Sequence, residues 1–238
     1  MSTPVRLSKR LIELISCSRR EAEIYIAGGW VSVDGQVVEL PQFMVADEIV
    51  ELHPDATLAP TLPVTILFNQ PADAGLNPGD IQKLISVDTQ TTEDHSGIRP
   101  LKQHLFKLIP GLPLEHNAGG LSVFSQDWRA SRKLMDDAAT MQQEYVVEVA
   151  GDIIPDGLKL LNHGLTFNGK LLTSAKVSWQ NEKRLRFALK GIHPGQIVHM
   201  CQKVGLQVVA MKRLRIGRIS MGKLPIGAWR YLKAHERF

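Results

Sequence analysis

The spacing of apolar residues predicts two short helices at the start of the chain. Between Leu7 and Leu14 leucines recur at every third or fourth position, which places one apolar face on a helix over residues 6–15. Ser18 and Glu21 then form a capping-box pattern, in which the hydroxyl and the carboxylate satisfy free amides at the start of a helix. A second helix should therefore begin directly after the first.

A β-hairpin is predicted after these helices. The second helix should end at Gly28-Gly29, because glycine favours the backbone conformation that terminates a helix. Residues 30–33 alternate as a strand, and Asp34-Gly35 is a strong two-residue hairpin turn leading into a strand over 36–38. Two helices and a hairpin fill about the first fifty residues.

The proline-rich residues 53–63 show no periodicity and are typical of a linker between domains. An apolar strand follows over 64–68, and residues 72–98 form a loop-rich insertion with one short amphipathic piece over 81–85. The apolar spacing then predicts a short helix over 101–109.

Strands outnumber helices in the remaining chain and follow one another directly. We expect helices over 128–139, 158–161 and 196–204, and strands over 144–149, 164–169, 175–179, 184–189 and 208–215. This order favours an α+β fold with a largely antiparallel mixed sheet. The predicted organisation is a small domain over 1–55, a linker over 56–63, and a larger domain over 64–238.

Composition limits the class of protein. The 238 residues are 44% apolar, which is enough for a sizeable core. Cys17 and Cys201 match no zinc spacing and predict a reduced, cytoplasmic protein without a metal or a disulfide. The sequence contains no apolar run long enough to cross a membrane, and its N-terminus has the pattern of a basic amphipathic helix and not of a signal peptide.

Positive charge is concentrated at the C-terminal end. The formal net charge is +4, but residues 182–238 hold thirteen Lys/Arg and two Asp/Glu, a net charge of +11. Such a surplus predicts a surface that binds a polyanion. A basic face that is only solvated remains the alternative.

The segments RLSKRL at 6–11, CSRREAE at 17–23 and GGWVSVDGQVV at 28–38 resemble the S4 RNA-binding module. In that family the first two helices present basic side chains to phosphate. The resemblance therefore implies RNA contacts by Arg6, Lys9, Arg10, Arg19 and Arg20. Arginine beside the free amides of a helix start is a sound anion site. The alternative is a structural helical pair whose arginines only keep it solvated.

Further segments resemble the S4-containing ribosomal RNA pseudouridine synthases. They are ILFNQP at 66–71, QQEYVVEV at 142–149, GQIVHM at 195–200 and KRLRIGRISMGKLPIGAWRYL at 212–232. The resemblance implies a pseudouridine-synthase-like fold for the larger domain and a reaction that uses no metal and no cofactor. It also implies RNA, in particular ribosomal RNA, as the partner. Nothing in the sequence argues against a monomer, which is the expected state. The target nucleotide would have to leave its stack.

The motif that should hold the catalytic residue is altered. Counting back from Gly120-Leu121 places Glu115 where the family has its catalytic Asp. Tyr145 stands where the family has the tyrosine that packs on the base, whereas Val198 replaces the cation that pairs with the acid and Pro113 replaces an arginine. A carboxylate displaced by about 1 Å can cost roughly 10²-fold in rate.

Three hypotheses follow from these changes. The first is an RNA-binding protein with lost or strongly impaired uridine isomerisation, and the second is a pseudouridine synthase that uses Glu115. In the second, His199, Arg99, Arg184 or Arg186 would have to supply the missing positive charge. A third, a protein-interaction scaffold, conflicts with the basic strand that carries Lys212, Arg213 and Arg215, which we expect to bind RNA.

Overall fold

The structure, a computed structural model, describes residues 3–72, 78–115 and 117–238. The chain divides into two compact units, one comprising Met1–Pro63 with Arg99–Phe106, and the other Val64–Ile98 with Lys107–Phe238. The segment Arg99–Phe106 thus belongs to the first unit, although the sequence placed it within the larger domain. We describe each unit by itself.

The first unit packs two helices against small antiparallel sheets. Its elements are β1 (Val5–Arg6), α1 (Leu7–Ile15), α2 (Arg19–Ala27), β2 (Val31–Val33), β3 (Gln36–Val37), β4 (Met44–Val45) and β5 (Val50–Leu52). β1 pairs with β4, and β2 lies between β3 and β5. Two leucines of the predicted apolar face, Leu7 and Leu11, are fully buried with Ile26 of α2 and Val31 of β2, whereas the third, Leu14, is 54% exposed.

The predicted capping box is present at the start of α2. The Ser18 hydroxyl accepts a hydrogen bond from the Glu21 amide at 3.2 Å, and the Glu21 carboxylate accepts one from the Ser18 amide at 2.7 Å. The Asp34-Gly35 turn also forms, because Asp34 and Gly35 both adopt the positive φ that a tight hairpin turn requires. Local sequence patterns were therefore sufficient to predict the two helices and the hairpin of this unit.

The second unit is built on a nine-stranded sheet with the order β12-β13-β9-β14-β8-β6-β16, to which β15 and β7 add at β14 and β8. β14 pairs with β8 in parallel and the other pairs are antiparallel. The strands are β6 (Thr65–Gln70), β7 (Ile109–Gly111), β8 (Ala118–Ser125), β9 (Gln142–Ala150), β12 (Lys176–Asn181), β13 (Arg184–Lys190), β14 (Gln207–Ile216), β15 (Ile219–Ser220) and β16 (Trp229–Tyr231). The predicted α+β fold with a largely antiparallel mixed sheet is confirmed.

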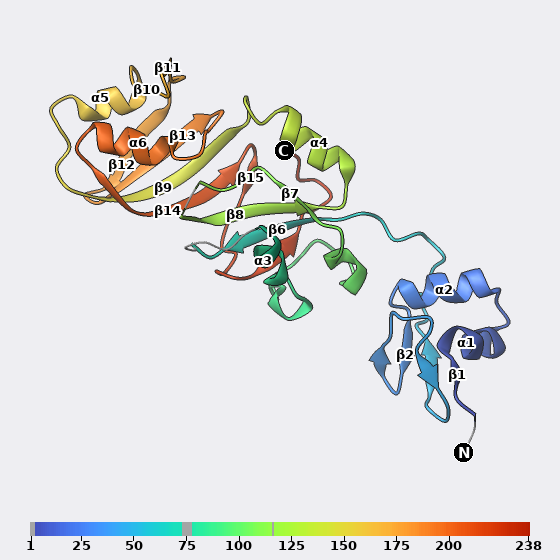
Figure 1. Ribbon diagram of the computed structural model, residues 1–238. Coiled ribbons are helices and arrows are strands. Elements are labelled where there is room, and N and C mark those ends of the chain that lie inside the picture. Colours follow the sequence, from blue (N-terminus) through green and yellow to red (C-terminus); the bar gives the residue numbers. More distant parts are fainter. Residues whose placement is uncertain (1–2, 73–77, 116) are drawn as a thin grey trace. The chain divides into compact units, whose positions relative to one another are not determined.

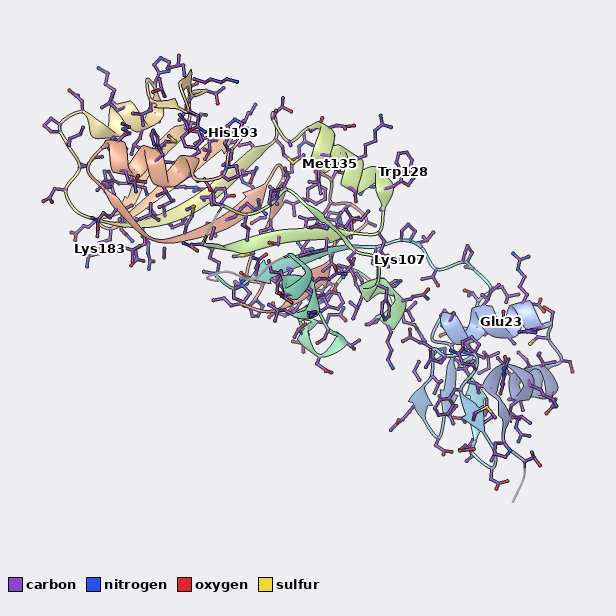
Figure 2. All side chains as sticks on the ribbon, viewed as in Figure 1. Glu23, Lys107, Trp128, Met135, Lys183 and His193 are labelled. Atoms are coloured by element: carbon purple, nitrogen blue, oxygen red, sulfur yellow. The ribbon has the colours of Figure 1, made fainter. Side chains whose placement is uncertain are left out.

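Helices cover parts of this sheet (Figure 1). They are α3 (Pro78–Lys83), α4 (Trp128–Asp136), α5 (Gly157–Asn162) and α6 (Gln196–Lys203), and a small hairpin of β10 (Thr166–Phe167) and β11 (Lys170–Leu171) follows α5. α5 and α6 bury Leu161, Ile197 and Met200 with the core-facing side chains of β9 and β13. On α4, Leu134 enters a second core cluster, whereas Trp128 and Met135 remain 61% and 70% exposed (Figure 2).

The predicted helix over 101–109 is wrong. Lys102–Leu105 form a short 3₁₀ helix, and Ile109–Gly111 instead form β7, which pairs with β8 between Val123 and Ser125. Lys107 has a φ of 53°, which breaks helical geometry between the two pieces. Pairing with a buried strand has outweighed the local apolar spacing, as tertiary context commonly does.

Two glycines in β8 allow its neighbours to approach closely. A Cβ atom at Gly119 would lie 2.6 Å from the Ala72 amide nitrogen, and one at Gly120 would lie 2.3 Å from the Arg213 carbonyl oxygen. Gly120 also has a φ of 103°, a backbone conformation that side chains rarely adopt. The junction of β8 with β14 therefore requires glycine.

Both cysteines are free thiols, and Cys201 is buried in α6. Across the described ranges, no helix combines the length and apolar character that a membrane crossing requires.

We predict that Gly120→Ala will destabilise the second unit far more than Gly164→Ala. Gly164 has nearly the same φ, 104°, but a Cβ there would have open space around it. Gly164→Ala should cost about 1–2 kcal/mol of unfolding free energy from backbone strain alone, and Gly120→Ala roughly 2 kcal/mol more, because β14 must also move. Urea denaturation measures both values, and equal losses would contradict the steric argument.

Candidate functional site

Glu115 lies on the loop between β7 and β8, at the centre of the sheet. Its side chain is 4% exposed. Leu112 and Asn117, on either side of it, have φ values of 38° and 61°, in the left-handed region that non-glycine residues adopt at a cost of about 1–2 kcal/mol. Such strain is retained only when surrounding contacts hold the backbone in place.

The Glu115 carboxylate is bound to the start of α6. Its Oε2 accepts a hydrogen bond from the Gly195 amide at 2.6 Å, and its Oε1 accepts one from the Ile197 amide at 3.1 Å. Amides at a helix start have no partner within the helix and attract negative charge. Glu115 therefore caps α6, with both oxygens engaged.

The charge of Glu115 is balanced by these amides and not by a cation. Among the described residues, no lysine, arginine or histidine forms an ion pair with it. Val198, one position after Ile197, packs its apolar side chain against the core.

The four residues considered as sources of the missing positive charge bind elsewhere. Arg184 and Arg186 pair with Glu148 and Glu144 at 3.0 and 2.6 Å. The His199 ring is hydrogen-bonded to the Thr166 carbonyl. Arg99, in the first unit, donates to the Gly29 carbonyl at 2.5 Å and lies 4.0 Å from the centre of the Trp30 ring.

Arg213 holds the loop that carries Glu115. Its guanidinium donates to the carbonyls of Leu121 at 2.7 Å, Pro113 at 3.0 Å and Leu112 at 2.9 Å. The fork of donors on arginine suits several acceptors at once, and here it binds the strained Leu112 backbone to β14. The side chain is completely buried, so the expected contact of Arg213 with RNA phosphate is wrong.

Tyr145 is packed beside this cluster on β9. Its hydroxyl donates to the Gln143 side chain at 3.2 Å, and Gln143 also accepts a hydrogen bond from Arg213 at 2.9 Å. Burial raises the pKa of the Tyr145 hydroxyl, and the positive charge of Arg213 opposes that rise. Tyr145 is therefore a neutral phenol, with 1% of its surface exposed.

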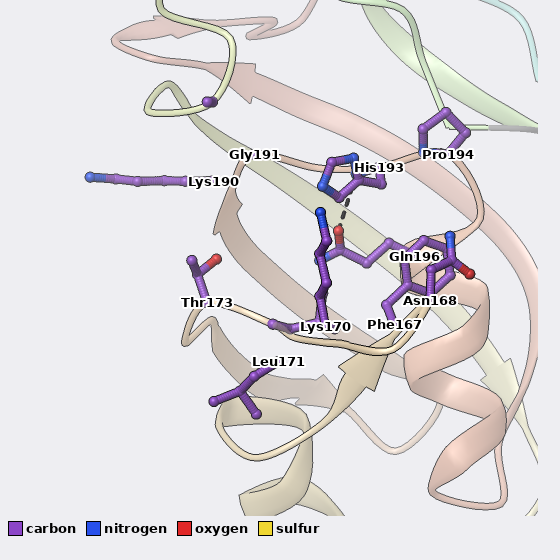
Figure 3. A pocket seen from close by; sticks show the side chains of 12 residues that line it. Phe167, Asn168, Lys170, Leu171, Thr173, Lys190, Gly191, His193, Pro194 and Gln196 are labelled. Carbon is purple, nitrogen blue, oxygen red and sulfur yellow. Dashed lines mark hydrogen bonds between the residues drawn. The ribbon is translucent and has the colours of Figure 1, made fainter.

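Two adjoining hollows run from Glu115 across the start of α6, and we call them together the trough. The first, of about 340 Å³, is lined by Glu115 and Tyr145. The second, of about 540 Å³, contains Lys170, Lys190 and His193 (Figure 3). The two share the lining residues Ala139, Gly191, His193 and Pro194.

Basic side chains line the second part of the trough. Lys170 points toward His193, and the His193 amide donates to the Gln196 side chain at 3.1 Å (Figure 3). Lys190 is exposed at the end of β13. The sequence analysis missed these residues, because they come from separate strands and loops that only the fold brings together.

In the first unit, three of the five predicted RNA-binding residues meet. Arg6, Lys9 and Arg19 line one surface hollow of about 410 Å³. Arg10 instead donates to the Ala46 carbonyl at 2.7 Å. Arg20 is exposed on α2, outside the lining of this hollow.

The two other basic residues predicted on β14 have different surroundings. Arg215 forms an ion pair with Glu144, which also binds Arg186. Lys212 is half-buried in a hollow separate from the trough.

Other chemistry has little support at this site. Within the described ranges, no group of three or more His, Cys, Asp or Glu side chains is arranged to hold a metal ion. Burial raises the pKa of the Cys201 thiol to about 12, so this residue is a neutral thiol and not a nucleophile.

Comparisons with known proteins find relatives along nearly the whole chain. The chain is 26% identical over 239 residues to a dual-specificity RNA pseudouridine synthase, RluF, of Salmonella typhi, with 98% of this chain and 78% of the relative covered. It is also 26% identical to ribosomal large subunit pseudouridine synthase B of Yersinia pestis, covering 94% and 71% of the two chains. An uncharacterised RNA pseudouridine synthase of Aquifex aeolicus matches at 26%, with 98% and 92% covered.

A crystal structure of a pseudouridylate synthase shares the fold, with a TM-score of 0.58 and 16% identity over 96% of both chains. The predicted pseudouridine-synthase-like fold is thereby confirmed. No family model matches the chain.

We predict that Arg213→Met will lower the unfolding free energy by about 3–5 kcal/mol, because the carbonyls of Leu112, Pro113 and Leu121 lose a buried donor. Arg218→Met, on the exposed turn after β14, serves as the matched control and should change it by less than about 0.5 kcal/mol. Urea denaturation provides the measurement. A loss below about 1 kcal/mol for Arg213→Met would show that these bonds do not hold the loop.

Proposed function

We propose that this chain, which belongs to the RNA pseudouridine synthase family as a distant member, binds structured RNA without isomerising uridine. Ribosomal RNA is the proposed partner, since one relative is named for the large ribosomal subunit. The proposal includes an S4-like RNA-binding role for the first unit and a cytoplasmic, monomeric protein that needs no cofactor.

The observation that carries this proposal is the binding of the Glu115 carboxylate to α6. Hydrogen bonds to a charged group contribute about 1.5–3 kcal/mol each, so freeing both oxygens would cost about 3 kcal/mol or more. A carboxylate that serves as a helix cap is a weaker nucleophile or base, because the two amides stabilise its negative charge.

The surroundings of Glu115 support the same conclusion. At the position where the resemblance implies a cation, Val198 contributes apolar packing to the core. The Gly195 and Ile197 amides now balance the negative charge. The replacement of the acid and that of its partner are therefore consistent with each other: the longer side chain reaches the helix start, and the cation is no longer required.

Two surfaces supply the proposed RNA contacts. In the first unit, Arg6, Lys9 and Arg19 surround one hollow, as phosphate recognition requires. In the second unit, Lys170, Lys190 and His193 line the part of the trough beyond Glu115. An RNA strand entering the trough would place its phosphates on these side chains and an unstacked nucleotide near Tyr145.

A second candidate function is slow pseudouridine synthesis with Glu115 as the acid. It is favoured by the preserved juxtaposition of Glu115 and Tyr145, which line the same part of the trough. This reading requires Glu115 to leave the Gly195 and Ile197 amides when RNA binds.

The first prediction from this proposal concerns catalysis. Incubated with ribosomal RNA, the unmodified chain should form no pseudouridine above background in site mapping, while a known RNA pseudouridine synthase assayed in parallel does. Glu115→Asp/Val198→Arg shortens the acid and restores a cation, so it is the variant in which isomerisation should reappear. Glu115→Ala and Val198→Arg alone are the matched controls.

Pseudouridine formed by the unmodified chain and lost in a folded Glu115→Ala variant would overturn the binding-only proposal and establish the second candidate.

The second prediction concerns RNA binding by the first unit. The logarithm of the affinity for a ribosomal RNA transcript should fall steeply with the logarithm of salt concentration, because phosphate contacts release counterions. Arg6→Ala/Lys9→Ala should flatten this slope by roughly 2, about one for each contact removed. Filter binding or fluorescence anisotropy across a salt series measures the slope.

Arg132→Ala is the control for this series, because Arg132 is an exposed arginine on α4 that pairs with Asp136. A slope near zero for the unmodified chain would favour a protein-interaction scaffold. Equal changes of slope in Arg6→Ala/Lys9→Ala and in Arg132→Ala would contradict the assignment of Arg6 and Lys9 as RNA contacts.

A further inference from the structure

One helix of the second unit carries large apolar side chains on its solvent side. On α4, Trp128 and Met135 are 61% and 70% exposed, and they lie two turns apart on one face of the helix. Ser131 and Leu134, further round the helix, are buried. Tryptophan and methionine are enriched where proteins bind other molecules. We call Trp128 and Met135, together with the adjacent Arg129, the α4 stripe.

The α4 stripe leads into the trough. Beyond α4 the chain passes through Ala138 and Ala139, and both residues line the trough, Ala139 in each of its two hollows. In Figure 2, His193, Met135 and Trp128 lie in this order across the view. Between Met135 and Trp128 the helix rises about 10 Å, a distance that about three stacked nucleotides span. A strand that leaves the trough can therefore continue along α4.

The stripe combines an aromatic ring with a positive charge. The Arg129 guanidinium carbon lies 5.7 Å from the centre of the Trp128 ring. Arg129 forms no ion pair within the described ranges, whereas Arg132, between Trp128 and Met135, is paired with Asp136 at 3.0 Å and contributes no free charge. A stacking ring beside a cation is typical of single-stranded nucleic acid sites, because a base covers the ring and a phosphate meets the cation.

A folded protein partner suits this surface less well. Specific protein interfaces bury about 800 Å² on each partner, whereas Trp128 and Met135 are the two large apolar side chains exposed on α4. The adjoining trough adds Lys170, Lys190 and His193 and not a larger apolar area. The charge of that neighbouring surface is complementary to a polyanion.

We propose that the α4 stripe binds single-stranded RNA that continues from the trough. One base stacks on Trp128, a neighbouring base packs against Met135, and a phosphate pairs with Arg129. The inference rests on the proposed function, because the same strand occupies the trough. It narrows that function to RNA in which the unstacked nucleotide is flanked by at least about three unpaired nucleotides.

The test is fluorescence titration of the full chain with a ten-nucleotide oligoadenylate RNA. Stacking of a base on Trp128 should quench part of the tryptophan emission. Trp128→Leu removes the ring and keeps an apolar side chain, so it should abolish that quenching and weaken binding by roughly tenfold or more. Trp128→Phe keeps a ring and should retain most of the affinity. Trp179→Leu, on β12, is the matched control and should retain both the quenching and the affinity.

A second pair of variants tests the phosphate contact. Arg129→Met should reduce the slope of the logarithm of decamer affinity against the logarithm of salt concentration by about 0.7, the value for one phosphate of a single strand. Lys183→Met, at the exposed turn between β12 and β13, should leave that slope unchanged (Figure 2). Thermal melting establishes that each variant is folded.

Decamer binding that Trp128→Leu leaves unchanged would overturn the inference, and so would a decamer that does not bind while the ribosomal RNA transcript does. In both cases binding of the transcript still supports the proposed function. If neither RNA binds, the proposed function and the inference both fail. Self-association of the unmodified chain that Trp128→Leu removes, measured by sedimentation, would identify the α4 stripe as a contact between two copies and would also overturn the inference.

Discussion

The centre of the second unit depends on one buried guanidinium. Arg213 extends from β14 and donates to three backbone carbonyls, of which two lie in the loop before β8 and one in β8 itself. These bonds hold Leu112 in an unfavourable backbone conformation and fix the loop on which Glu115 is carried. They form only because Gly120 lets β8 approach β14 so closely. The parallel junction, the strained loop and the buried acid thus depend on one another.

The position of Glu115 follows from this arrangement, and the proposed function rests on it. A loop held at both ends presents the carboxylate to the start of α6, where two amides donate hydrogen bonds to it. The same contacts that stabilise the helix also stabilise the negative charge of the carboxylate. Because the amides already balance the charge of Glu115, position 198 needs no cation, and Val198 packs against the core. The proposed binding without catalysis rests on this cap and on an apolar neighbour, with Tyr145 and an adjoining basic trough beside them.

Charge on this protein is informative only when its burial is known. The basic C-terminal quarter, read as a series of residues, predicted a single RNA-binding strand. In the structure three of its residues separate: Arg213 is a buried structural arginine, Arg215 pairs with Glu144, and Lys212 is half-buried in a hollow separate from the trough. These three residues of one strand thus have three environments. Strand alternation and a bulge between Arg213 and Arg215 point their side chains in different directions from the sheet.

The sequence by itself determined what local chemistry decides: the capping box at Ser18, the hairpin turn at Asp34-Gly35, the helical faces and the α+β order of elements. It also singled out Glu115 as the candidate acid. Only the tertiary structure decided that residues 109–111 form a strand, that Arg213 is internal, and that Glu115 caps α6. Each of these outcomes depends on partners many residues away along the chain, such as the carbonyl of Leu121 for Arg213 and the amide of Ile197 for Glu115. Hydrogen bonds of that range leave no periodic pattern in a sequence, because their geometry exists only after the sheet has formed.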